Sequence, residues 1–117
     1  MVNKRIERIK EDIKRELAVI FTKLKDPRIT KNFISVLRVE ISNDLSYCKI
    51  YISAIEGLEK AKEAVIGLDS AKGFIKRELG TRLEIRHIPS LIFTPTDSLE
   101  YSANISKIIS TLNGDLQ

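Results

Sequence analysis

The sequence is poor in the residues that build disulfides, metal sites and catalytic sites. It has one cysteine, Cys48, and one histidine, His87. A single cysteine excludes a disulfide within the chain and a thiolate-rich metal site. Cys48 falls in an alternation of apolar and polar residues, which indicates a buried structural thiol. No nucleophile neighbours His87, so we expect a partly buried or hydrogen-bonded imidazole and not a catalytic one.

Other patterns of catalysis are missing too. No glycine-rich loop precedes a Lys-Ser or Lys-Thr pair, as a nucleotide site would need. Asp44, Asp69 and Asp97 fall at expected turns or helix caps and form no pair at ligand spacing. We therefore expect no cofactor, no metal and no enzymatic activity.

Long apolar runs are absent as well. None approaches the ~20 residues that span a bilayer, and residues 1–8 are charged without the apolar core of a signal peptide. The length of 117 residues suits one hydrophobic core. These features predict a single domain over residues 1–117, monomeric and cytoplasmic.

Positive charge is present in excess but is concentrated in two segments. The net charge is +4, whereas Lys4–Arg15 has six basic and three acidic residues and Ala71–Arg86 has five basic and two acidic ones. Such clusters fit a nucleic-acid-binding surface. Composition alone slightly favours the alternative, which is two solvated helix faces with internal ion pairs such as Glu11 with Arg15.

An amphipathic helix is predicted at the N-terminus. Lys4, Arg8 and Arg15 fall opposite its apolar stripe and face solvent or a partner. Asp26-Pro27 is predicted to end the helix, since proline disfavours helical conformation in the residue before it. The stripe recurs at three- and four-residue steps and consists of Ile6, Ile9, Ile13, Leu17, Ile20 and Leu24.

Two strands follow, over residues 33–42 and 46–53. In both, aliphatic residues alternate with polar ones, as a strand with one covered face requires. Ser42-Asn43-Asp44-Leu45 supplies turn-forming side chains between them. An antiparallel hairpin is predicted.

Helical periodicity returns from Leu58 and is interrupted at 69–73. We expect a helix, a kink and a second helix, with Gly73 as the hinge because glycine reaches positive φ without steric cost. The alternative is that Gly73 only accommodates helix packing. Gly80 is predicted to end the second helix.

A third strand is predicted over Leu91–Thr94. Leu83-Glu84-Ile85 either extends this strand or forms an arm beside it. A last helix is predicted over about 98–112, burying Tyr101, Ile105, Ile108, Ile109 and Leu112. The order α-β-β-α-α-β predicts an α+β fold with helices on one side of a three-stranded sheet.

Several motifs in this order carry a family resemblance. They are Lys25-Asp26-Pro27-Arg28, the run from Val39 to Leu45, the run from Ser70 to Leu79, the run from Leu83 to Pro89, and Leu91-Ile92-Phe93. Over roughly residues 3–112 the chain resembles the ribosome-binding factor A family.

The resemblance implies a type II KH-like fold. It also implies that the usual Gly-x-x-Gly phosphate-clamping loop is replaced by a kink, here Ala71-Lys72-Gly73. One glycine beside an alanine allows less close approach of backbone to phosphate, so we expect side chains to contact RNA shape and phosphates.

The resemblance further implies a function. Family members are expected to bind the free small ribosomal subunit, to aid late maturation of its RNA near the 5′ end, and to support growth in the cold. A ribosome-assembly GTPase is the expected partner in release. The candidate RNA contacts are Lys4, Arg5, Arg8, Arg15, Arg28, Lys72, Lys76, Arg77, Arg82 and Arg86.

Two alternatives stay open. Arg28 follows Asp26-Pro27, where a cap or turn role is as well supported as an RNA contact. The whole basic surface would also suit a protein-interaction module that binds an acidic partner.

Overall fold

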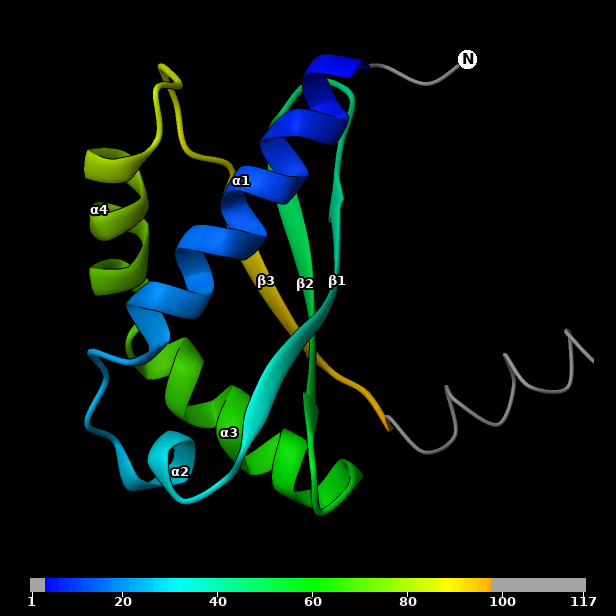
Figure 1. Ribbon diagram of the computed structural model, residues 1–117, viewed down its shortest axis with the longest axis vertical. Helices are drawn as coiled ribbons and strands as arrows, with labels where there is room; N and C mark the ends of the chain where they lie inside the picture. Colours follow the sequence, from blue (N-terminus) through cyan, green and yellow to red (C-terminus); the bar gives the residue numbers. More distant parts are fainter. Residues whose placement is uncertain (1–3, 98–117) are drawn as a thin grey trace, which may run out of the picture.

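A computed structural model describes residues 4–97 of the chain (Figure 1). The predicted order α-β-β-α-α-β is confirmed, with one additional short helix after the first. The C-terminal helix predicted at 98–112 lies outside the described residues. The elements are α1 (Lys4–Phe21), α2 (Pro27–Thr30), β1 (Ile34–Ile41), β2 (Tyr47–Ala54), α3 (Leu58–Ser70), α4 (Lys72–Arg82) and β3 (Ser90–Pro95).

The three strands form one sheet in the order β1-β2-β3. β1 and β2 make the predicted antiparallel hairpin, with Ile34 opposite Ala54 and Ile41 opposite Cys48. β3 pairs with β2 in parallel, so the chain must cross from one end of the sheet to the other, and α3 and α4 make that crossover.

The helices pack on one side of this sheet, as the α+β, KH-like arrangement requires (Figure 1). Along β2 the residues that face the helices are buried, whereas Tyr47, Lys49 and Tyr51 on the other face are not. The apolar stripe of α1 enters the core, where Ile13, Leu17 and Ile20 have no exposed surface. Other fully buried side chains of the core come from β2, α3 and α4: Cys48, Ile50, Ile52, Leu68, Ile75 and Leu79.

Cys48 is buried, as its place in the pattern indicates. Loss of hydration raises the pKa of its thiol to about 12, because the thiolate cannot be solvated there. The thiol is therefore protonated and unreactive at neutral pH.

The end of α1 differs from the prediction. The helix ends at Phe21 instead of at Asp26-Pro27. The apolar spacing continues to Leu24, which is buried beyond the helix, so periodicity alone placed the end too late. Asp26 instead caps α2: its side chain accepts a hydrogen bond of 2.9 Å from the backbone N–H of Arg28, and Pro27 opens the helix.

The kink is present, but its predicted hinge is wrong. The break between α3 and α4 falls at Ala71, with φ −96° and ψ 7°. Gly73 is a helical residue of α4, and among the glycines of residues 4–97 only Gly57 has a positive φ. A Cβ at Gly73 would meet nothing nearer than Arg77 Nη1 at 3.8 Å.

The second helix and the third strand also extend beyond their predicted limits. α4 continues through Gly80 to Arg82, so the prediction that Gly80 ends it is wrong. Interior glycine costs only about 1 kcal/mol, which neighbouring packing can offset. Leu83-Glu84-Ile85 forms no strand and is an arm between α4 and β3.

Candidate nucleic-acid interface

The first part of the candidate interface is the solvent face of α1. Lys4, Arg5, Arg8 and Arg15 are all exposed. They are exposed because the opposite side of the helix carries the apolar stripe that enters the core. The sequence prediction of a cationic outer face on this helix is confirmed.

Arg15 makes two ion pairs with carboxylates of its own helix. It contacts Asp12 at 3.1 Å and Glu16 at 3.4 Å, and not Glu11 as the sequence suggested. The Arg15 side chain is 66% exposed, and such surface pairs contribute little to stability. Its guanidinium therefore stays largely open to solvent.

The second part of the interface is α4 and the kink that precedes it. Lys76 and Arg77 are exposed, as predicted. Lys72 is half-buried: its Nζ lies 3.3 Å from Asp69 and 6.0 Å from the centre of the Phe93 ring. Of these three cations, Lys76 and Arg77 make no ion pair within the described part of the chain.

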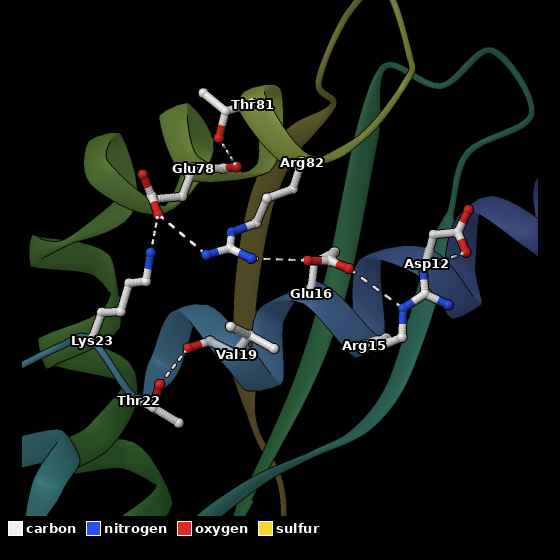
Figure 2. Close-up of polar contacts among 9 residues, drawn as sticks. All are labelled: Asp12, Arg15, Glu16, Val19, Thr22, Lys23, Glu78, Thr81 and Arg82. Carbon is white, nitrogen blue, oxygen red and sulfur yellow. Dashed lines mark hydrogen bonds and ion pairs between the residues drawn. The ribbon is translucent and has the colours of Figure 1, made fainter.

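The two basic segments are adjacent because α1 packs on α4. Figure 2 shows how ion pairs join the helices: Lys23, in the turn that follows α1, lies 3.0 Å from Glu78, and Arg82 lies 3.2 Å from Glu16 and 3.8 Å from Glu78. The hydrogen bond from Lys23 holds the pKa of Glu78 below its ordinary value, against the opposing effect of burial, with Arg82 and Arg77 adding attraction.

Arg82 differs from the other candidates in its surroundings. Its side chain is 26% exposed, and its Nε is buried without a hydrogen-bond partner. Two carboxylates from two helices hold its guanidinium. We infer that Arg82 chiefly positions α4 against α1.

A second junction brings α1 and the arm together. A hollow of about 270 Å³ lies between them, with Arg5 and Arg8 on one wall and Leu83, Glu84 and Ile85 on the other. Arg86 follows directly and is exposed. The cations of the N-terminal helix and those that follow α4 thus belong to one continuous part of the surface.

Arg28 lies apart from α1, in the short helix α2. Its guanidinium contacts both carboxylate oxygens of Asp26, at 2.6 Å to Oδ2 and 3.0 Å to Oδ1, and Ser70 Oγ at 3.3 Å. The hydrogen bonds from Arg28 lower the pKa of Asp26. The cap role of this motif is confirmed, and the position beside Ser70 places Arg28 next to the kink.

Three residues of this region escaped sequence reasoning: Glu16, Lys23 and Glu78. Their pairings join positions far apart in the chain, and no local spacing signals them.

The described residues offer little for other chemistry. Within 4–97 no three His, Cys, Asp or Glu side chains are placed to hold a metal ion. His87 is exposed, so the partly buried imidazole, one of the two expected environments, is wrong; the residue lies at a bend of the chain between α4 and β3. None of the helices in this part of the chain is long and apolar enough to cross a membrane.

Comparison with known proteins gives consistent matches. The family model described as ribosome-binding factor A matches residues 5–109. Ribosome-binding factor A of Finegoldia magna is 40% identical over 111 residues, which cover 94% of this chain and 92% of that protein.

Solved structures agree in fold. The crystal structure of ribosome-binding factor A from Thermus thermophilus superposes with a TM-score of 0.67 at 29% identity, covering 76% of this chain and 92% of that one. A homology model of the Thermus thermophilus factor, fitted into a cryo-EM map of its complex with the 30S subunit, gives a TM-score of 0.57 at 28% identity, covering 76% and 88% of the two chains.

Proposed function

Because the chain belongs to the ribosome-binding factor A family, we propose that it binds the free small ribosomal subunit and promotes late maturation of that subunit's RNA. The proposal includes processing near the 5′ end and support of growth in the cold. The factor acts in the cytoplasm as a monomer, without catalysis, and a ribosome-assembly GTPase assists its release.

The observation that carries the proposal is the packing of α1 against α4. It places the exposed cations of both helices, and those beside the arm, on adjoining surfaces. Each cation that neutralises a phosphate releases a counterion, so several contacts together give affinity that depends strongly on salt. The proposed contacts are Lys4, Arg5, Arg8, Arg15, Lys72, Lys76, Arg77 and Arg86, together with Arg28 of α2 and the partly buried Arg82.

The kink favours side-chain contacts over clamping of a single strand. Ala71 occupies the break and carries a Cβ, and Gly73 lies within a regular helix. Neither residue supplies the paired glycine backbone of a Gly-x-x-Gly loop. Lys76 and Arg77, one turn further on, extend from the same helix and suit contact with the phosphates of structured RNA.

Binding alone is sufficient for such a factor to act. A protein that binds one RNA conformation and not its competitors stabilises that conformation by RT ln(1 + [L]/Kd), about 2.7 kcal/mol at a hundredfold excess over Kd. No bond need be made or broken by the protein.

Co-sedimentation tests the proposal directly. The purified protein is spun with free small subunits, with mature whole ribosomes and with an unrelated structured RNA, at low and at high salt. Preference for free small subunits that weakens with salt supports the proposal. Equal binding to the subunits, the ribosomes and the unrelated RNA would reduce the proposed function to general RNA binding. Absence of binding at both salt concentrations would favour an acidic protein partner.

A further inference from the structure

An apolar groove lies between α1, α2 and the start of β1. Its volume is about 550 Å³, and its lining is mostly apolar. We call it the α1–β1 groove and define it by Ala18, Phe21, Phe33, Ile34 and Val36, with Lys14 at its rim. None of these five apolar residues is fully buried, and Phe33 is 76% exposed.

The groove also lies beside an unpaired sheet edge. β1 is an outer strand of the sheet, so one side of its backbone has no strand partner among the described residues. The β1 ladder is further interrupted between Val36 and Arg38 by a register shift. Outer strands with exposed apolar side chains favour contact with another segment unless something covers them.

A segment with matching chemistry follows the described residues in the same chain. Between 98 and 112, Tyr101, Ile105, Ile108, Ile109 and Leu112 recur at the spacing of one helix face. A helix of this length is marginal in isolation and gains stability when its apolar stripe packs on an apolar surface.

The described part of the chain ends level with the groove along the strands. The backbone N–H of Thr96 donates to Ile52 O at 2.8 Å, and Ile52 is the partner of Val36, which lines the groove. The chain therefore leaves β3 at the level of the groove, two strand spacings from β1, which is roughly 10 Å. The four residues from 98 to 101 span about 13 Å when extended, which is enough to bring Tyr101 to β1.

From these observations we propose that residues 98–112 of this chain dock their apolar stripe in the α1–β1 groove. The covalent connection favours this occupant over a separate molecule, because a short linker gives an effective concentration of the order of millimolar. Docking covers Phe33 and shields the β1 edge.

Paramagnetic labelling of the full-length protein tests the docking. A nitroxide is attached through Ser106→Cys, which lies beside the stripe and not within it. Cys48 has no exposed surface and will not react, so one label per chain is expected. The proposal predicts loss of amide signals at Ala18, Phe21, Phe33 and Ile34 and no loss on the open face at Tyr47 or Ile92.

Two matched variants sharpen this test. Phe33→Ser should restore the groove signals, because it removes the most exposed apolar contact without touching the core. Ile66→Ser removes a similar exposed side chain, 56% exposed on α3, and should leave the loss unchanged.

Three outcomes would overturn the proposal. One is unchanged groove signals in the labelled protein. Another is loss confined to the open sheet face. The third is loss that appears on an isotope-labelled chain when the nitroxide is on a different chain, which would make the occupant a second copy.

Discussion

The Arg82 guanidinium lies 3.2 Å from Glu16 Oε1, joining α4 to α1 across a gap of 66 positions in the sequence (Figure 2). Both side chains are mostly covered, at 26% and 18% exposure. This pair holds together the two helices whose outer faces carry the proposed RNA contacts.

Arg82→Ala is expected to destabilise the fold by about 1–3 kcal/mol, because it leaves Glu16 and Glu78 without their shared cation. The free energy of unfolding, measured with urea, checks this. Arg15→Ala is the matched control, since Arg15 is 66% exposed and its pairs should be worth less than about 1 kcal/mol. Equal losses in the two variants would contradict the positioning role of Arg82.

Lys76→Ala together with Arg77→Ala should weaken binding to the small subunit and leave the fold intact, because both side chains are exposed on α4. The slope of log affinity against log salt should fall by about 1 for each phosphate contact removed. The control is Lys60→Ala with Lys62→Ala on α3, which changes net charge equally at a distance from α1. If the affinity and the salt slope were unchanged, α4 would not be part of the interface.

Gly73→Ala and Gly67→Ala should have opposite effects on stability. Gly73 is helical with free space around it, so alanine should stabilise the fold by about 0.4–1 kcal/mol. At Gly67 a Cβ would lie 3.0 Å from Ile29 Cγ1 and 3.3 Å from Asp26 Oδ2. Crowding of α2 against α3 should therefore destabilise that variant by about 1–3 kcal/mol.

Thermal unfolding followed by circular dichroism measures both glycine variants. Binding of Gly73→Ala to small subunits adds separate information. If this more stable variant binds more weakly, Gly73 serves close approach to RNA as well as helix geometry.

The ion pairs of Glu78 should make stability depend on pH. In the folded protein the pKa of Glu78 is below its ordinary value of 4.5, chiefly through the hydrogen bond from Lys23. The unfolded chain therefore binds the proton first as pH falls. The stabilisation is complete above the ordinary pKa and is lost as pH falls through the lowered one.

Glu78→Gln should abolish this contribution and so flatten the dependence of the urea midpoint on pH below 4.5. Asp26, Glu40 and Asp44 also have lowered pKa values and contribute to the pH dependence of the wild type. The contribution of Glu78 is therefore the difference between the curves of the wild type and the variant. Glu56→Gln, an exposed carboxylate on the turn after β2, is the control. Identical curves for wild type and Glu78→Gln would count against the prediction.

Ile13→Asp should prevent folding. Ile13 has no exposed surface and lies in the centre of the stripe, so the substitution places an unpaired charge in the core. Circular dichroism should show loss of helix, whereas Glu11→Ala on the exposed side should not. A folded Ile13→Asp protein would mean that α1 does not pack as described.

Within residues 4–97 the repeated spacing of apolar residues was enough to predict every major helix and strand, since α1 must bury its isoleucines and β2 must bury every second residue. It was not enough to place the ends of helices. Leu24 is buried just as the α1 stripe is, so nothing in the spacing separates a helical residue from one in the turn beyond it.

The candidate site was predictable only in its charge. The exposure of Lys76 and Arg77 follows from the side of α4 on which they lie. Arg82 is basic too, but its side chain turns toward α1, where it pairs with Glu16. Contacts between residues so distant in the chain depend on how whole helices pack. Local sequence therefore identified which residues are cationic, and packing decided which of them remain exposed.

The parallel pairing of β2 with β3 determines when the fold can be completed during synthesis. Cys48 of β2 pairs with Leu91 of β3. One edge of β2 therefore stays unpaired until α3, α4, the arm and β3 have been synthesised. Until then the growing chain carries a hairpin with an unprotected edge, a known risk for aggregation. Chains cut before Ser90 should be insoluble and be degraded in the cell, and closure by β3 should be the slow step of folding.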